Sequence, residues 1–255
     1  AHPYVVAALA QEAGVLASLP RGIPAPGLVG FDSVDGWSVL VLEVVVGRMP
    51  GQPWTQADID AAHDTCRVVA ELGTPTTLGS RDYAHRISTD PDILRVATAM
   101  SDRSFAGGRE LPSWLPRHQT RVGELVLGAG GRFEGDTLSH GDLRPDNLLV
   151  EPAGRVVVVD WNWVGRAAAW LDWVGLLPMM AWQGVDTGPL VAESPLTRDV
   201  DPEAVDAFLA CIAVYMVEGY PRTPPPGCTT ALRRHQLLMA HMFLELLRGR
   251  RGWAT

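Results

Sequence analysis

The most informative segment of this chain reads His140-Gly141-Asp142-Leu143-Arg144-Pro145-Asp146-Asn147, and it is followed by the apolar run Val156-Val157-Val158-Val159-Asp160. Together they supply one carboxylate, an amide five residues later, and a second carboxylate at the end of a predicted strand. Phosphoryl transfer needs such a set, because one carboxylate orients the attacking hydroxyl while an amide and another carboxylate hold Mg²⁺ against nucleotide phosphates. Asn occurs at only two positions in the chain, so a chance match to this spacing is rare.

Each of these residues also has a simpler interpretation. Asp and Asn are common turn formers, and a His-Gly-Asp sequence could cap a strand. Asp160 could equally be the N-cap that follows a strand. We favour a functional role, because a carboxylate that emerges from four consecutive valines needs a partner, which Mg²⁺ would provide.

Composition bounds the possible functions. The chain has 255 residues, 47% of them apolar, which is enough for one large domain or two lobes. We see no membrane span and no leader peptide, and the odd number of cysteines indicates reduced thiols in a cytoplasmic protein. The net charge of −8 argues against a nucleic-acid partner and is compatible with a cationic substrate, although solubility explains it equally well. All 21 basic residues are Arg, so this sequence contains no lysine for catalysis.

The first 46 residues predict one helix and an incomplete sheet. Apolar residues recur at helical spacing from Val5 to Leu16. Two β-rich runs, 28–31 and 37–46, flank Asp35-Gly36, a dipeptide that favours a hairpin turn. Because an isolated two-stranded hairpin is marginally stable, we interpret residues 1–46 as a partial N-terminal lobe.

From residue 54 onward the pattern is mainly helical. Thr55 precedes Asp58 in an N-cap pattern, and the helix that it begins should end near Gly73. Residues 74–91 and 128–136 are predicted loops. Further helices are expected up to about residue 104 and at 117–127, 167–183, 201–219 and 229–251, and the apolar stripe of the last one should be core. The predicted fold class is therefore α+β, with a helical C-terminal lobe spanning 47–255.

With these features in view, the chain resembles the aminoglycoside phosphotransferase and choline kinase-like family, which has a protein-kinase-like fold with two lobes. The residues that carry the resemblance are Leu40–Val44, His140-Gly141-Asp142, Asn147, Asp160 and Trp170-Leu171-Asp172. The spacing from His140 to Asn147 matches the kinase catalytic loop, with Gly141 where protein kinases have Arg.

The resemblance implies a role for each matching position. Asp142 would orient the substrate hydroxyl and accept its proton, and His140 would brace the loop through hydrogen bonds. Asn147 and Asp160 would bind Mg²⁺ on the phosphates of ATP or GTP. Asp172 would support the catalytic loop, although it could simply cap its own helix. Arg144 stands where many protein kinases place a lysine near the γ-phosphate, where a cation would offset developing charge.

The same resemblance assigns nucleotide-site roles to N-terminal residues and exposes a departure. Glu43, Val44 and Val45 would form the hinge that meets the adenine edge. Glu12 would be the helix glutamate that pairs with a strand lysine, but no lysine and no Gly-rich turn stand before it. Either the first strands precede Ala1 or the nucleotide is held without them; we expect the former, because a lone hairpin exposes an unpaired edge.

Two functional hypotheses follow. The first is an enzyme that moves the γ-phosphoryl group of a nucleoside triphosphate to a hydroxyl of a small, polar or cationic molecule, in the cleft between the lobes. The alternative is a catalytically weak kinase-like module that binds a nucleotide or another ligand. The acceptor, the choice of ATP or GTP, and the oligomeric state stay open. Tryptophans near Asp160 and acidic residues of the C-terminal helices could contact a substrate, but packing and a solvated surface are the simpler interpretations.

Overall fold

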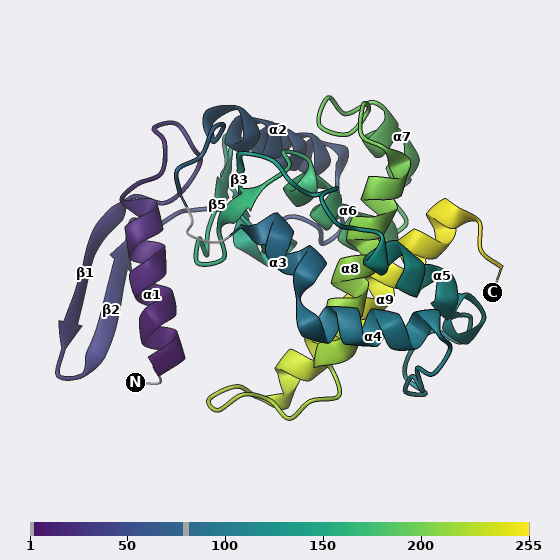
Figure 1. Cartoon of the computed structure of the whole chain (residues 1–255). Helices are drawn as coiled ribbons and strands as arrows, with labels where there is room; N and C mark the ends of the chain where they lie inside the picture. The colour runs from purple at the N-terminus through teal and green to yellow at the C-terminus, as the bar shows by residue number, and fades with distance from the viewer. Residues whose placement is uncertain (1–2, 79–81, 255) are drawn as a thin grey trace. The chain divides into compact units, whose positions relative to one another are not determined.

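The computed structural model describes residues 3–78 and 82–254 of the chain (Figure 1). Within them the structure is helix-rich with short strands, which confirms the predicted α+β class. The helices are α1 (Pro3–Leu16), α2 (Gln56–Leu72), α3 (Tyr83–Thr89), α4 (Pro91–Ser101), α5 (Leu115–Leu127), α6 (Leu171–Trp182), α7 (Thr187–Ala192), α8 (Pro202–Gly219) and α9 (Thr230–Arg251). The strands are β1 (Leu28–Val34), β2 (Trp37–Leu42), β3 (Thr137–Ser139), β4 (Leu148–Val150), β5 (Val156–Val158) and β6 (Gly165–Ala167).

The chain divides into two compact units. Unit 1 comprises Ala1–Tyr83 and Gly135–Met179, and unit 2 comprises Ala84–Glu134 and Met180–Thr255. The strands pair as three two-stranded antiparallel sheets, β1–β2, β3–β6 and β4–β5, and all three belong to unit 1. This division follows internal contacts, so the predicted lobe boundary after residue 46 stays a prediction.

The N-terminal part of unit 1 is a hairpin packed against a helix, as the sequence predicts. β1 and β2 are joined by Asp35 and Gly36, both at positive φ (50° and 77°), and α1 contacts both strands. The second strand is shorter than predicted, because it ends at Leu42 instead of continuing to residue 46. Its partner strand begins at Leu28 and is preceded by Pro24 and Pro26, which have no N–H to donate to a ladder.

Elsewhere in unit 1, the ends of α2 are set by neighbouring residues, whereas β6 forms through pairing with a distant strand. The hydroxyl of Thr55 accepts the backbone N–H of Asp58, and Gly73 caps the other end of α2, which confirms that prediction. The predicted helix over 167–183 starts too early, because Gly165–Ala167 pairs with β3 and α6 begins only at Leu171. The alanine-rich sequence there favours a helix, but pairing with a distant strand overrides that preference.

Unit 2 is helical in its described part. Four predicted helices are present: α4 is the helix expected to end near residue 104, and α5, α8 and α9 correspond to the helices expected at 117–127, 201–219 and 229–251. Thr229 is the N-cap of α9. The α9 stripe is core, since Gln236, Met239 and Leu246 are buried. Two short helices were missed: α7, and α3 inside the predicted 74–91 loop, whose residues 79–81 lie outside the described chain. Such short helices carry too few turns to show a period.

Candidate active site

The residues predicted to perform chemistry all belong to unit 1. They lie on α1, on the segment after β2, on the loop between β3 and β4, after β5, and on α6 (Figure 1). They are Glu12, Glu43, Val44, Val45, His140, Asp142, Arg144, Asn147, Asp160 and Asp172. Among the described residues, the hydrogen bonds and ion pairs that hold their side chains also come from unit 1.

Asp172 holds the start of the catalytic loop, the segment 140–147. Its carboxylate accepts hydrogen bonds from the Ser139 hydroxyl (2.8 Å) and from the backbone N–H groups of His140 (2.7 Å) and Gly141 (3.1 Å). A carboxylate that accepts several N–H and O–H groups makes strong, directional contacts. Asp172, at the start of α6, is therefore placed where a loop-supporting residue has to be.

Gly141 is required by the shape of the catalytic loop. Its φ is +78°, in the left-handed region that favours glycine. A Cβ at this position would lie 2.7 Å from the carbonyl oxygen of Trp163 and 3.2 Å from the ring of Tyr83. The local packing therefore explains why glycine stands where protein kinases carry arginine.

His140 is a buried brace. Its Nε2 donates to the carbonyl oxygen of Val159 at 3.0 Å, and its ring meets the Trp161 ring edge-to-face at 4.9 Å. Burial lowers the pKa of His140, with Asp172 partly opposing that shift. The Nε2–H group of His140 therefore links the catalytic loop to Val159, the residue before Asp160.

Asp142 shares a guanidinium with Asp146. Nη1 of Arg144 donates to both carboxylate oxygens of Asp142 (3.0 and 2.8 Å), while its Nε and Nη2 form a parallel pair of bonds to Asp146 (both 3.0 Å). Burial raises the pKa of Asp142 to about 6, because the lowering by Arg144 is partly offset by the charges of Asp160 and Asp146. A carboxylate of that pKa is a stronger base than an exposed one.

Asn147 and Asp160 are brought together by one strand ladder. β4 pairs with β5 through Leu148 and Val158, and the next bond joins the Val159 N–H to the Asn147 carbonyl at 3.0 Å. Asp160 directly follows, at a φ of +67°. The Asn147 side-chain N–H₂ donates to the Asp142 carbonyl at 2.8 Å, so the catalytic and metal candidates share one hydrogen-bonded cluster.

The donor atoms of this cluster suit Mg²⁺. Because the Asn147 Nδ2 is committed to Asp142, its Oδ1 is left as the ligand atom, and no described residue donates to it. Mg²⁺ is commonly held by one or two protein oxygens and completed by phosphates and water. Asn147 and Asp160 fit that pattern, whereas the described residues contain no group of three or more His, Cys, Asp or Glu side chains arranged to hold a metal ion.

Glu12 is buried beside the metal candidates rather than paired with a cation. Its carboxylate accepts the Trp161 N–H at 3.2 Å, and within the described ranges no ion pair reaches it. Burial raises the pKa of Glu12, and the nearby charge of Asp160 raises it further. The structure thus places the predicted nucleotide-site glutamate against the backbone that carries Asp160.

The segment proposed as a hinge is open. The Glu43 N–H donates to the Gly27 carbonyl at 2.8 Å, after which the chain leaves the hairpin. Val44 is 89% exposed, and among the described residues the backbone groups of Val44 and Val45 make no hydrogen bond. These groups are available to a planar ligand edge, which is what the predicted role requires.

Sequence reasoning missed several residues that shape this site. Gln11 donates from its side chain to the Asn162 carbonyl at 2.8 Å, and the Asn162 side chain donates to the Asp160 carboxylate. Asp146, which orients Arg144, was also overlooked. The only signals were that Gln11 adjoins Glu12 and that Asn is rare in this chain. Of the nearby tryptophans, Trp161, Trp170 and Trp173 are buried, as expected for packing residues.

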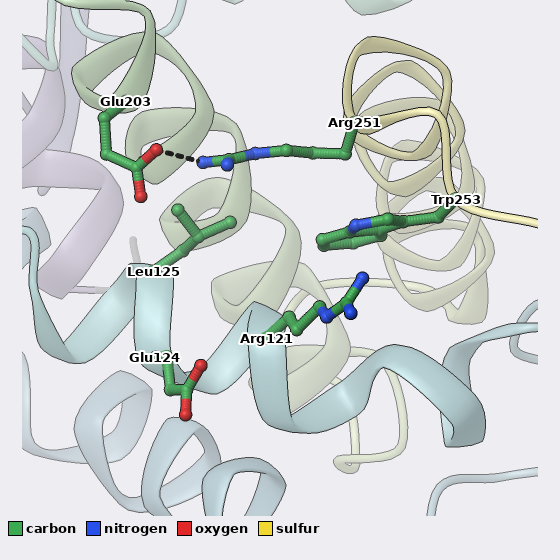
Figure 2. Close-up of a pocket in the computed structure, with 6 residues that line it drawn as sticks. All are labelled: Arg121, Glu124, Leu125, Glu203, Arg251 and Trp253. Carbon is green, nitrogen blue, oxygen red and sulfur yellow. Dashed lines mark hydrogen bonds and ion pairs between the residues drawn. The ribbon is translucent and has the colours of Figure 1, made fainter.

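Unit 2 contains a separate hollow of about 400 Å³. Figure 2 shows its lining and the ion pair between Glu203 and Arg251 at 2.5 Å. Its lining residues are Arg121, Glu124, Leu125, Glu203, Arg251 and Trp253. None of the predicted catalytic or metal residues is among them. The chemistry of the chain therefore points to the hydrogen-bonded cluster in unit 1.

The arrangement just described is that of a protein-kinase-like fold, and comparison with solved structures identifies the same class. The chain has the fold of the aminoglycoside phosphotransferases. It matches a thermostable mutant of APH(4)-Ia in complex with ADP and hygromycin B (13% identity, TM-score 0.62), covering 97% of this chain and 84% of that one. No family model matches the chain, and no curated protein sequence matches it significantly.

Two further solved structures give the same result. The AMP-bound spectinomycin phosphotransferase APH(9)-Ia matches with 14% identity and a TM-score of 0.55, over 99% of this chain and 84% of that one. An aminoglycoside phosphotransferase from Alicyclobacillus acidocaldarius subsp. acidocaldarius DSM 446 matches with 16% identity and a TM-score of 0.54, over 98% and 82%. At these identities the comparison defines the fold, and the activity has to be argued from the site.

Proposed function

We propose that this chain is a nucleotide- and Mg²⁺-dependent phosphotransferase that moves the γ-phosphoryl group of ATP or GTP to a hydroxyl of a small molecule. The observation that carries the proposal is the cluster of Asp142, Asn147 and Asp160, in which Asn147 is hydrogen-bonded both to Asp142 and to Val159, the residue before Asp160. Each of the three chemical groups that phosphoryl transfer requires is present in that cluster.

The mechanism follows from the positions of these groups. Asp142 orients the acceptor hydroxyl and takes its proton as the acceptor oxygen bonds to the γ-phosphorus and the bond to the bridging oxygen breaks. Asn147 and Asp160 would hold Mg²⁺, which neutralises charge on the phosphate oxygens when it is bound. Arg144 already lies against Asp142 and is oriented by Asp146, so its guanidinium would stand beside the transferring group and offset part of the charge there.

The acceptor is proposed by class. One solved protein of this fold is a complex with ADP and hygromycin B, and another is a spectinomycin phosphotransferase. A cationic or polar aminoglycoside is therefore the first acceptor class to test. Phosphorylation of such a compound would make this an antibiotic-resistance enzyme. We place the reaction in the cytoplasm, where triphosphates are available and where free cysteines such as Cys66 and Cys211 stay reduced. No helix in the described ranges has the length and apolarity needed to cross a membrane.

A second candidate function is a kinase-like module that binds a nucleotide without efficient transfer. The observation that favours it is Glu12, which is buried and bonded to a backbone N–H, whereas the family that the chain resembles pairs this glutamate with a lysine. Without a cation at that position, the phosphates of a bound nucleotide could be held too loosely for turnover. The two candidates differ in whether Asp142 matters to any measured rate.

The test measures phosphoryl transfer by the full chain from ATP and from GTP, with and without Mg²⁺, to a panel of amino-sugar and amino-alcohol acceptors. Asp142→Asn should lower kcat about a thousandfold, and Asp160→Asn should abolish the Mg²⁺ dependence. Asp199→Asn, which changes an exposed carboxylate of unit 2, is the matched control and should leave the rate unchanged. Nucleotide binding with no Asp142-dependent transfer to any acceptor would instead establish the binding module.

A further inference from the structure

The metal candidate Asp160 begins a tight turn, residues 160–162, that is anchored to α1 by two consecutive residues. Gln11 donates from Nε2 to the Asn162 carbonyl at 2.8 Å, and Glu12 accepts the Trp161 N–H at 3.2 Å. One donor and one acceptor of α1 therefore hold the backbone of two neighbouring residues of the same turn. The pair spans about 150 positions of sequence, so it connects two segments that no local interaction joins.

The turn needs such an anchor because its backbone is unfavourable. Asp160 has a φ of +67°, a region that non-glycine residues occupy only when surrounding contacts hold them there. The side chain of Asn162 completes the link by donating to the Asp160 carboxylate. Gln11 thus holds the backbone of Asn162, and the side chain of Asn162 orients Asp160, the candidate metal ligand.

We propose that Gln11 is a positioning residue: through the Asn162 carbonyl it fixes the 160–162 turn, and through the Asn162 side chain it aims the Asp160 carboxylate. This inference rests on the proposed function for the use of Asp160, but the anchoring itself requires no ligand. Gln11 is half-buried and makes its bond with a neutral amide, so its contribution is geometric.

The first arm of the test is hydrogen exchange on the full chain without ligand. Gln11→Ala removes the donor while keeping a strong helix former in α1. Exchange of the Trp161 N–H should accelerate about three- to tenfold, the range expected for loss of one hydrogen bond. The Val159 N–H should be unaffected, because the β4–β5 ladder holds it. Gln11→Glu, nearly identical in shape but without the donor, should act in the same direction.

A matched control exists on α2. Gln56 donates from Nε2 to Asp60 at the same distance, 2.8 Å, on an exposed helix face. Gln56→Ala removes the same chemical group and should leave the exchange of Trp161 unchanged. If Gln11→Ala and Gln11→Glu both leave Trp161 exchanging at the wild-type rate, the inference is wrong.

The second arm of the test distinguishes the Gln11–Asn162 hydrogen bond from the Asn162–Asp160 hydrogen bond. Asn162→Ala removes the side-chain bond to Asp160 but keeps the carbonyl that Gln11 contacts. It should raise the Mg²⁺ concentration needed for half-maximal nucleotide stabilisation about three- to tenfold, while the Trp161 exchange stays near wild type. Because both residues act in series on Asp160, the Gln11→Ala/Asn162→Ala double variant should need no more Mg²⁺ than the worse single variant. Fully additive effects would contradict the series.

Failure of this inference can be told apart from failure of the proposed function. A wild-type chain that binds no Mg²⁺–nucleotide would overturn the proposed function, and the exchange comparison would still decide whether Gln11 holds the turn. A chain that binds and transfers normally with unchanged Trp161 exchange in both Gln11 variants would overturn the inference alone.

Discussion

Two carboxylates of unit 2 and three carboxylates at the candidate site of unit 1 have different kinds of partner. In unit 2, Asp206 is buried between Arg250 (2.6 Å) and Arg251 (2.7 Å), and Glu218 is paired with Arg95 (3.2 Å) and Arg222. In unit 1, the Glu12, Asp160 and Asp172 carboxylates accept hydrogen bonds from neutral groups, and none of them has an ion-pair partner among the described residues.

This difference distinguishes carboxylates that stabilise the fold from carboxylates that are free to bind a ligand. A carboxylate held between two arginines, as Asp206 and Glu218 are, contributes to packing and has little left to offer a ligand, whereas Asp142 shares its single arginine with Asp146. A half-buried carboxylate bonded only to neutral donors still attracts a cation, and a metal ion is the cation that the proposed reaction uses. In unit 2, Asp199, Asp201, Glu203, Asp206 and Glu218 are each within ion-pair distance of an arginine, and whether any of these acidic residues or Glu193 contacts a substrate stays open.

The largest effect on stability is expected in unit 2. Asp206→Asn should lower the free energy of unfolding by about 3 kcal/mol, because it leaves the largely buried Arg250 without its carboxylate and Arg251 with Glu203 alone. Nucleotide binding should be unchanged. Urea unfolding, with the exposed Asp199→Asn variant as control, measures the change. A loss below about 1 kcal/mol would show that these ion pairs are no more structural than surface ones.

The next effect is a pH dependence carried by Asp142. Its pKa of about 6 in the folded chain lies above that of an unfolded aspartate, so Asp142 stabilises the fold most at low pH. This contribution is complete below about pH 4 and is lost as the pH rises through about 6. Relative to Asp142→Asn, the metal-free wild type should lose about 2 kcal/mol between pH 4 and pH 7. A difference that does not vary with pH would mean that the Asp142 pKa is ordinary.

Asp172 should have a smaller effect on stability and a clear effect on activity. Asp172→Asn replaces a carboxylate that accepts three hydrogen bonds with an amide that cannot satisfy all three donors. We expect a loss of about 2 kcal/mol in unfolding free energy and a reduced kcat, with nucleotide affinity retained. Thermal unfolding and steady-state kinetics test this together, and unchanged kcat would assign Asp172 to helix packing alone.

The smallest change in the free energy of unfolding is expected for Asp160→Asn, and it should contrast most clearly with the large change expected for Asp206→Asn. Asp160→Asn should alter the unfolding free energy by less than about 0.5 kcal/mol, because no ion pair is broken and Asn tolerates a positive φ. It should nevertheless remove the Mg²⁺-dependent stabilisation by nucleotide, which is about 2.7 kcal/mol at a hundred times the Kd. If Asp160→Asn destabilised the metal-free chain as much as Asp206→Asn, the two classes of carboxylate would not differ.

Much of the fold and the composition of the candidate site followed from patterns within a few residues. The Thr55 cap, the Asp35-Gly36 turn and the long helices α2, α8 and α9 depend on short-range hydrogen bonds or a repeating apolar face, and these are legible in sequence. The segment 140–147 is similar, because Asn147 reaches Asp142 across a single loop. Its separation of five residues was enough to predict that the two would cooperate.

Contacts between distant segments could not be predicted in this way. β6 forms where the local sequence favours a helix, because it completes a ladder with β3. The strand that starts at Trp37 stops at Leu42, because Leu42 lies opposite Leu28, where its antiparallel partner begins. Glu12 meets the Trp161 N–H rather than a cation, and Gln11 reaches Asn162 across 151 positions. Local spacing therefore specified which chemical groups the site contains, whereas only the folded chain decided what holds them, since hydrogen bonds between remote segments exist only after the backbone has brought them together.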